Sequence, residues 1–282
     1  MFTLNCNGRL LSASGPLVMG VINATPDSFY AGSRFSASDA VVDQADKMIR
    51  EGADIIDIGG QSTRPGSTLV GAEEESTRIV PAIEAVHKAF PEMFISVDTW
   101  YASVAKAAVA AGASIINDVS GGSLDKDLWS TVASLRVPYV LMHMKGTPQT
   151  MQQHAHYENV TRDVLDFFVQ TIPRLHEAGI YDIIADPGFG FGKTIAHNFE
   201  LLRNLSVFNI LNKPLLLGLS RKSTVYKTLQ TTAEHALNGT TVLNTIGLMN
   251  GASILRVHDV KEAREAVVLV EALKGIRNNN QK

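Results

Sequence analysis

The chain has 282 residues, a formal net charge of −3, and 45% hydrophobic and 19% charged residues. This composition provides enough apolar side chains for a buried core and excludes a disordered chain. No basic block stands out, so nucleic acid is a poor candidate partner. Cys6 is the only cysteine, which excludes an internal disulfide or a multi-cysteine zinc site and indicates a reducing cytoplasm.

The start of the chain lacks the features of a secretion signal. No basic region followed by an apolar run occurs in residues 1–16. The longest apolar stretches, such as Pro214 to Leu219, are too short to cross a bilayer. We therefore expect a soluble, cytoplasmic protein with no membrane partner.

The chain opens with a pattern typical of a β-hairpin. Phe2–Asn5 and Arg9–Leu11 flank the dipeptide Asn7-Gly8, which readily adopts the positive φ angles of a tight turn. Such a hairpin would close the bottom of a barrel. From residue 17 onward, short apolar runs alternate with longer amphipathic helix patterns.

Eight of the apolar runs are candidate strands. They lie at residues 17–23, 54–60, 94–99, 114–118, 138–144, 182–188, 214–220 and 253–259. Most are continuously apolar, as is typical of parallel strands buried on both faces. The clearest helices are one capped at Ser38-Asp39 and ending near Gly52, one from Ser103 to Ala111 stopped by Gly112, and those at 158–178 and 261–274.

Repeated βα units along the whole chain predict an α/β fold, a (β/α)8 TIM barrel with an N-terminal β-hairpin. Five or six units would instead favour an open, doubly wound sheet. No Pro/Gly-rich linker, composition break or low-complexity tract interrupts the chain. We expect a single domain over residues 1–282, with its core at about residues 17–275.

Nearly every predicted strand ends in a side chain that can do chemistry. A barrel enzyme carries its site at the carboxyl ends of its strands, so these side chains are expected to form one polar ring. Burying them without a ligand would cost roughly 1–3 kcal/mol for each unpaired group, which predicts a polar small-molecule site. The ring consists of Asn23, Gln61-Ser62-Thr63-Arg64, Asp98, Asn117-Asp118, Met142-His143, Asp186, Ser220-Arg221-Lys222 and Arg256-Val257-His258.

Two groups of residues within the ring favour different ligand chemistry. Planar or multidentate cations suit a phosphate or diphosphate, and an Asn oxygen among them suits Mg²⁺. The expected rim consists of Asn23, Arg64, Lys222, Arg256 and His258.

A buried carboxylate can accept two parallel N–H bonds from a guanidine-like heterocycle edge. The expected floor consists of Asp98, Asn117 and Asp186. Together they suggest, without specifying it uniquely, a nitrogen heterocycle that carries a diphosphate.

Some polar and aromatic residues also have structural interpretations. Asp118 and Asp259 are equally well explained as helix N-caps. His143 is best interpreted as a hydrogen-bonded core histidine. The remaining histidines outside the ring are interpreted as solvated: His87, His154, His156, His176, His197 and His235. The Gly-rich segment 186–193 lacks the Walker spacing, which excludes a nucleoside triphosphate site. Phe189 and Phe191 are interpreted as an aromatic wall over a ring ligand, with loop packing as the alternative.

Eight motifs occur in the order and approximate spacing of dihydropteroate synthases. They are MGVINATPDSF, GGQSTRPG, VDT, INDVSGG, LMHMKGTP, DPGFGFGK, SRKS and RVHDV. VDT alone is uninformative, but the combination is highly specific and runs from about Met19 to Val260. The chain therefore resembles this family over almost its whole length.

The resemblance implies roles for individual residues. Asn23 would be the Mg²⁺ and diphosphate ligand, and Arg256 and His258 would hold the diphosphate. The implied pterin site consists of Asp98, Asn117, Met142, Asp186 and Lys222. The implied p-aminobenzoate site consists of Thr63, Arg64, Phe191 and Ser223. The loops that hold Thr25-Pro26-Asp27 and Ser62-Thr63-Arg64 resemble two mobile loops that close over the site.

The implied reaction joins (7,8-dihydropterin-6-yl)methyl diphosphate to p-aminobenzoate, giving 7,8-dihydropteroate and diphosphate. In the implied dissociative course, diphosphate leaves first, stabilised by Mg²⁺ and the rim, and the arylamine captures a pterin methylene cation. Asp98, Lys222 and Arg64 would be the catalytic residues, and no covalent nucleophile is needed. The family likeness also implies a homodimer formed through outer helices and a target of sulfonamides.

Two positions depart from the family pattern, and both concern loop closure. Ala31 stands where an acidic residue is usual, and Gln61 stands where Glu is common. Two alternatives to the synthase explain the sequence less well. A methyltetrahydrofolate-binding methyltransferase domain needs neither the Arg256 and His258 pair nor the STRPG loop. A non-catalytic pterin-binding barrel is disfavoured because the metal and diphosphate residues are intact.

Overall fold

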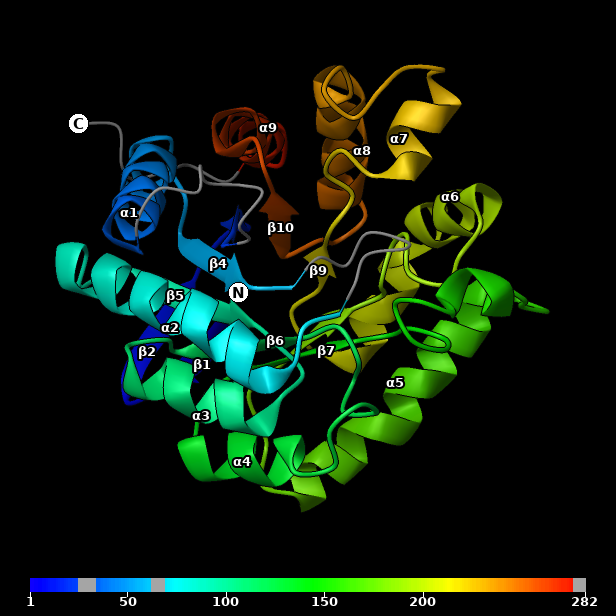
Figure 1. The fold of residues 1–282 in the computed structure, drawn as a ribbon. Helices are drawn as coiled ribbons and strands as arrows, with labels where there is room; N and C mark the ends of the chain where they lie inside the picture. The colour runs from blue at the N-terminus through cyan, green and yellow to red at the C-terminus, as the bar shows by residue number, and fades with distance from the viewer. Residues whose placement is uncertain (25–33, 62–68, 276–282) are drawn as a thin grey trace.

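A parallel β-barrel with helices packed around it forms the body of the protein (Figure 1). This computed structural model describes residues 1–24, 34–61 and 69–275, with the backbone alone over 34–37. The strands lie in the order β8-β7-β6-β5-β4-β3-β10-β9. A parallel bridge between Ala185 in β8 and Leu215, next to β9, closes the sheet. The predicted (β/α)8 barrel is confirmed.

All neighbouring barrel strands run parallel, and their residues are almost all buried. The barrel strands are β3 (Leu17–Asn23), β4 (Ile55–Gly59), β5 (Phe94–Asp98), β6 (Ile115–Asp118), β7 (Tyr139–Met142), β8 (Ile183–Asp186), β9 (Leu216–Leu217) and β10 (Ile254–Val257). The α-helices are α1 (Arg34–Arg50), α2 (Ala72–Ala89), α3 (Ala102–Ala110), α4 (Leu128–Leu135), α5 (Val160–Glu177), α6 (Ile195–Arg203), α7 (Ser223–Thr228), α8 (Leu237–Met249) and α9 (Val260–Leu273). Short 3-10 helices lie at η1 (Met151–His154) and η2 (Leu205–Leu211).

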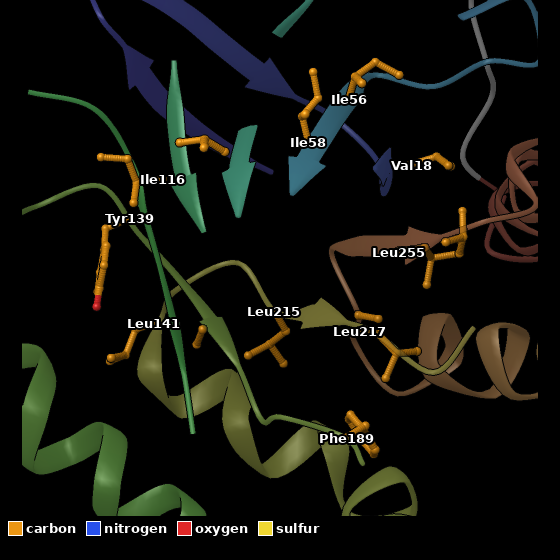
Figure 2. Close-up of a cluster of buried hydrophobic side chains, with 14 of the residues drawn as sticks. Val18, Ile56, Ile58, Ile116, Tyr139, Leu141, Phe189, Leu215, Leu217 and Leu255 are labelled. Atoms are coloured by element: carbon orange, nitrogen blue, oxygen red, sulfur yellow. The ribbon is translucent and has the colours of Figure 1, made fainter. Parts of the chain in front are cut away.

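The largest hydrophobic core lies between the barrel and its helices (Figure 2). Because side chains alternate along a strand, Ile56 and Ile58 of β4 both point to this layer, as do Tyr139 and Leu141 of β7. The long helix α5 begins after Asn159, whose side chain accepts a hydrogen bond from the Arg162 backbone N–H. The core thus forms a shell around the barrel and leaves the carboxyl ends of the strands to polar residues.

The predicted N-terminal hairpin is confirmed, and it closes the bottom of the barrel. Strands β1 (Phe2–Cys6) and β2 (Arg9–Ala13) pair antiparallel around Asn7 and Gly8, whose φ angles are 55° and 85°. Leu4 and Leu11 point from the hairpin into a second apolar cluster, to which every barrel strand contributes a residue. The hairpin therefore supplies the apolar cover that the lower end of the barrel needs.

Two predicted elements differ from the observed ones. The helix predicted to be capped at Ser38-Asp39 begins earlier, at Arg34, so these cap-type residues lie inside α1 and the predicted start was wrong. The strand predicted at 214–220 is confined to Leu216–Leu217, because the chain turns where the Lys222 backbone N–H donates to the Leu219 carbonyl. Over the described ranges, no helix combines the length and the apolar character required to span a membrane.

The hairpin should contribute measurably to stability. Leu4 is 3% exposed and Leu10 of the same hairpin is 64% exposed. We expect Leu4→Ala to lower the free energy of unfolding by about 2–5 kcal/mol, because the change opens a cavity in the lower cluster. Urea denaturation measures the loss. The matched control Leu10→Ala should change stability by about 0.5 kcal/mol or less, and equal losses in the two variants would contradict the role given to the hairpin.

Candidate active site at the barrel mouth

The strand register brings described members of the predicted polar ring together at one end of the barrel. Paired neighbours form one row across four strands: Asn23, Gly59, Asp98 and Asn117. Met142 pairs with Asp186 on the next two strands in the barrel. At Gly59 a Cβ atom would lie only 3.2 Å from the Asp98 Cβ, so glycine leaves room for that carboxylate. The three floor residues thus lie at the ends of three barrel strands, as predicted.

Arg256 connects two buried carboxylates inside the barrel. Its Nε donates to Asp57 Oδ2 at 2.7 Å, and its Nη2 donates to Asp98 Oδ2 at 2.7 Å. Burial opposes the charged form of Arg256, but the two carboxylates outweigh it and raise its pKa. Arg256 is therefore joined to the floor, and its role toward a diphosphate on the rim stays a prediction.

Asp57 is a member of this site that the sequence analysis missed. It is fully buried in the middle of β4, and Asn117 Nδ2 donates to the same Oδ2 atom at 3.2 Å. Among the described residues, its other oxygen, Oδ1, has no hydrogen-bond partner. The signal was present in the sequence, because a charged residue inside the apolar run DIIDIGG is costly to bury without a partner.

The carboxylates of the floor have shifted pKa values. Burial raises the pKa of Asp98 to about 7; the charge of Arg256 opposes the shift, and the charge of Asp57 adds to it. Burial also raises the pKa of Asp186, against the lowering effect of Lys222. Asp186 Oδ1 accepts the backbone N–H of Gly188 at 2.7 Å. Such carboxyl groups can hold or release a proton closer to neutral pH than an exposed carboxyl group.

Lys222 and Phe191 form a cationic and aromatic side of the site. Lys222 Nζ donates to the Phe189 carbonyl at 2.6 Å and lies 4.6 Å from the centre of the Phe191 ring. Burial lowers the pKa of Lys222 to about 8. Phe189 itself is fully buried in the core (Figure 2), so the aromatic-wall interpretation was wrong for Phe189 and stays a prediction for Phe191.

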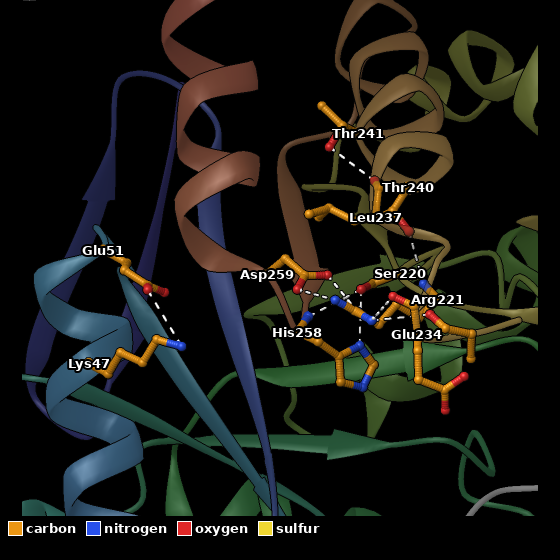
Figure 3. Close-up of polar contacts among 11 residues, drawn as sticks. Lys47, Glu51, Ser220, Arg221, Glu234, Leu237, Thr240, Thr241, His258 and Asp259 are labelled. Carbon is orange, nitrogen blue, oxygen red and sulfur yellow. Dashed lines mark hydrogen bonds and ion pairs between the residues drawn. The ribbon is translucent and has the colours of Figure 1, made fainter.

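His258 lies at the barrel mouth beside an ion pair that joins two loops (Figure 3). Arg221, in the left-handed region with a φ of 53°, donates to both oxygens of Asp259 at 2.8 and 2.7 Å. Ser220 Oγ lies 3.0 Å from His258 Nδ1. Desolvation of its ring lowers the pKa of His258 to about 4, although the residue is partly open to solvent. The charge of Arg256 lowers this pKa further. This lowered pKa favours the neutral imidazole at pH 7.

The structure decides between the alternative interpretations of three residues. Asp118 accepts hydrogen bonds from the backbone of Ser120 and Gly122 and from the Tyr139 hydroxyl, so it caps a turn after β6 rather than a helix. Asp259 does occupy the N-cap position of α9, but its side chain makes no cap bond and pairs with Arg221 instead. His143 is buried with its Nδ1 3.0 Å from Lys193 Nζ, which confirms it as a core histidine.

Asn23 is suited to hold one position on a magnesium ion. It is exposed at the end of β3, and over the described part of the chain its side chain makes no hydrogen bond. The same residues contain no group of three or more His, Cys, Asp or Glu side chains that could hold a metal ion alone. Mg²⁺ is often bound by one or two protein oxygens together with waters and substrate phosphates, so a single amide oxygen fits this manner of binding.

Several predicted residues lie outside the described residues. They are Thr63 and Arg64 of the predicted p-aminobenzoate site, the loop residues Thr25, Pro26, Asp27 and Ser62, and the departure at Ala31. Ser223 is described: it is half-buried at the start of α7, directly after Lys222. Gln61, the other departure, is described as well.

The family is settled by comparison with known proteins. Residues 19–258 match the family described as "Pterin binding enzyme". This chain belongs to the pterin-binding enzyme family. The dihydropteroate synthase of Escherichia coli K12 is 42% identical over 280 residues, which cover 99% of each chain. The predicted resemblance to dihydropteroate synthases, and with it a C–N bond-forming transferase, is confirmed.

Solved structures of pterin-binding enzymes share both fold and sequence with this chain. The Xanthomonas albilineans dihydropteroate synthase in complex with 7,8-dihydropteroate superposes with a TM-score of 0.87 at 38% identity, covering 98% of this chain and 100% of that one. The Yersinia pestis enzyme with a sulfonamide drug complex gives a TM-score of 0.91 at 41% identity, covering 97% and 100%. At this sequence identity the chain shares the family of these proteins as well as their fold.

The family departure at Gln61 is built into a hydrogen-bonded brace. Gln61 Nε2 donates to Glu75 Oε2 at 2.6 Å and to the Val70 carbonyl at 2.7 Å, while its Oε1 accepts the Val70 N–H at 3.1 Å. Tyr101 also donates to the Val70 carbonyl. Burial raises the pKa of Glu75, and the Gln61 amide is among the groups that oppose this rise. Gln61 thus connects the Val70 backbone to a buried carboxyl group.

We expect Gln61→Glu to destabilise the protein in a pH-dependent way. The new carboxylate would face Glu75, so one of the two would bind a proton, with a folded-state pKa above its unfolded value. The folded state would then bind more protons than the unfolded one, and stability would fall as pH rises through that pKa. We expect a loss of about 1–3 kcal/mol near pH 8 and a smaller one near pH 5.

Thermal unfolding of the variant across this pH range measures the effect. The matched control Gln61→Leu removes the same hydrogen bonds without adding a charge, so its loss should vary much less with pH. A Gln61→Glu loss that does not vary with pH would show that the two side chains do not share a proton.

Proposed function

We propose that this pterin-binding enzyme joins (7,8-dihydropterin-6-yl)methyl diphosphate to p-aminobenzoate, giving 7,8-dihydropteroate and diphosphate. The observation that carries the proposal is the set of buried floor residues, Asp98, Asn117 and Asp186, beside the Lys222 and Phe191 side chains. Acceptors that are buried at this depth gain from a ligand with several N–H donors. The solved relative with 7,8-dihydropteroate supports the same assignment.

In this proposal the pterin ring lies on the floor. Asp186 uses Oδ1 for the Gly188 N–H, which leaves Oδ2 for the N–H groups of the heterocycle. Met142 is buried at the end of β7 and packs in the same apolar cluster as Phe191, next to the place for a flat ring. Asn117, held by Asp57, adds an amide that can both donate and accept. The floor would therefore read the hydrogen-bonding edge of the ring.

The bond change in this reaction needs charge stabilisation more than a nucleophile. The C–O bond to diphosphate breaks with its electron pair on the leaving group, and the arylamine nitrogen then forms the C–N bond and loses a proton. Asp98 would stabilise the positive charge on the pterin methylene group. Its raised pKa makes it able to hold a proton, so its stabilising charge would be lost as pH falls through about 7.

The remaining proposed roles concern the diphosphate and p-aminobenzoate. When bound, Mg²⁺ would neutralise charge on the diphosphate, and Asn23 would provide a protein oxygen to it. Arg256 and His258 are proposed to contact the diphosphate, whose charge would raise the low pKa of His258. The proposed p-aminobenzoate residues are Thr63, Arg64, Phe191 and Ser223. Lys222 would contact the pterin and, with Asp98 and Arg64, take part in catalysis.

A coupled assay with purified protein tests the proposed function. We expect 7,8-dihydropteroate and diphosphate to form in equal amounts, with turnover reduced at least about tenfold when Mg²⁺ is removed by chelation.

His258→Ala should weaken the binding of the pterin diphosphate and of free diphosphate, but not of a pterin without phosphates.

Three results would contradict this assignment. Pterin binding without diphosphate release would favour a non-catalytic pterin-binding barrel. Turnover that is independent of Mg²⁺ would remove the proposed metal role. Equal losses for both classes of ligand in His258→Ala would mean that His258 supports the fold rather than the anion.

We further propose that the chain acts as one cytoplasmic domain and as a homodimer, with no nucleic acid or membrane partner. Helices α8 and α9 lie side by side (Figure 1). Both helices carry exposed apolar side chains. These side chains are Val242, Ile246, Met249, Val268, Leu269 and Leu273. Residues 242, 246 and 249 follow helical spacing along one face of α8, and exposed patches of this kind mark interaction surfaces. A second copy of the chain is the proposed occupant.

Light scattering coupled to gel filtration tests this interface. We expect the wild-type protein to elute with the mass of a dimer and Ile246→Asp to shift it toward the monomer, because a buried, unpaired carboxylate opposes association. Ile210→Asp is the control, since Ile210 is an exposed apolar residue in η2. A wild-type monomer, or dissociation by the control variant as well, would rule out the α8 and α9 surface as a specific interface.

A further inference from the structure

Lys193 is buried beside the site and has no role in the reaction proposed above. Its side chain is 3% exposed. Its Nζ lies 2.9 Å from the Gly188 carbonyl, 3.1 Å from the Phe191 carbonyl, and 3.2 and 3.0 Å from the carbonyl and Nδ1 of His143. Burial lowers the pKa of Lys193 to about 7. In its ammonium form the group has three donors and no acceptor, so these four acceptors saturate it.

Two of the four acceptors, the Gly188 and Phe191 carbonyls, belong to one turn at residues 188–192. Its glycines Gly188, Gly190 and Gly192 have φ angles of 72°, 83° and 60°, so the turn is built from the residues with the greatest backbone freedom. At Gly188 a Cβ atom would lie 2.0 Å from the His143 carbonyl, so no larger residue fits. The turn is bridged by a hydrogen bond from the Phe191 N–H to the Gly188 carbonyl at 3.1 Å. Lys193 binds the carbonyls of both these residues.

Lys222 holds the same turn through a contact that must change. Its Nζ donates to the Phe189 carbonyl and lies over the Phe191 ring. If Lys222 contacts the pterin during turnover, it loses some of this interaction with the turn. Lys193 is out of reach of solvent and already saturated, so its contacts persist.

We propose that Lys193 is a positioning residue for p-aminobenzoate, which holds the 188–192 turn so that the Phe191 ring stays in place while Lys222 exchanges partners. The inference rests on the function proposed above. Lys193 touches no substrate and acts through Phe191. His143 supports the arrangement, because an Nδ1 that accepts from Lys193 leaves the imidazole proton on Nε2. Burial keeps the pKa of His143 well below its usual range, so the ring remains an acceptor.

Steady-state kinetics of Lys193→Met, with each substrate varied separately, test the proposal. The variant keeps the length and removes the donors. We expect the KM for p-aminobenzoate and the inhibition constant of a sulfonamide to rise about tenfold, with the KM for the pterin diphosphate changed less than about threefold. Lys145→Met is the matched control, since Lys145 is a nearby lysine that contacts the Tyr157 ring and the His156 carbonyl, and it should leave all three constants unchanged.

A double-mutant cycle with Phe191→Leu tests the route of action. If Lys193 acts through the Phe191 ring, Lys193→Met should add less than about threefold to the p-aminobenzoate KM in the Phe191→Leu background. Should Lys193→Met not fold, Lys193→Gln, which keeps an amide donor, replaces it. This variant should also raise the KM for p-aminobenzoate selectively, but by a smaller factor. Equal rises in both substrate KM values, or a full tenfold effect in the Phe191→Leu background, would overturn the proposal. A wild-type protein that makes no dihydropteroate would instead refute the function proposed above.

Discussion

The ion cluster formed by Arg256, Asp57 and Asp98 is the constraint on which the site depends. Separated from its partners, each of these charges would be costly to bury inside the barrel. The guanidinium of Arg256 contacts both carboxylates, and Asn117 donates a further hydrogen bond to Asp57 Oδ2. Because these residues come from β4, β5, β6 and β10, the cluster fixes the relative positions of strands from both ends of the sequence. Loss of Arg256 would leave two buried carboxylates without their cation.

The fold was predictable because its signals are periodic and repeated. Eight apolar runs separated by helix patterns have few topologies open to them, and the resulting barrel matches the sequence prediction apart from the start of α1 and the length of β9. Those two differences have local causes. Ser38 and Asp39 have cap chemistry but lie within a helix that begins upstream, and the turn at Leu219 to Lys222 shortens the last but one strand.

The site was predictable only at the level of strand ends. Register explains why the floor residues Asp98, Asn117 and Asp186 share the barrel mouth, since parallel strands place their carboxyl ends together. Strand register does not show how far a side chain extends or which partner it contacts. Arg256 was expected on the rim, but its long side chain joins the floor, and Asp57 was passed over because it sits in the middle of a strand. Phe189 and Phe191 are two residues apart in sequence, yet only tertiary packing distinguishes the core residue from the site residue.

The hairpin at the bottom of the barrel has a consequence for the traffic of ligands. With β1 and β2 packed over the lower end, every molecule that reaches the floor must arrive through the mouth and depart the same way. A pterin bound on Asp186 would lie deeper than an arylamine beside Phe191 and Lys222, so the arylamine would lie across its exit. If the proposed reaction takes place in this site, access through a single opening would impose an order on it. The heterocycle would enter first, and the coupled product would leave as one piece with the end nearer the mouth leading.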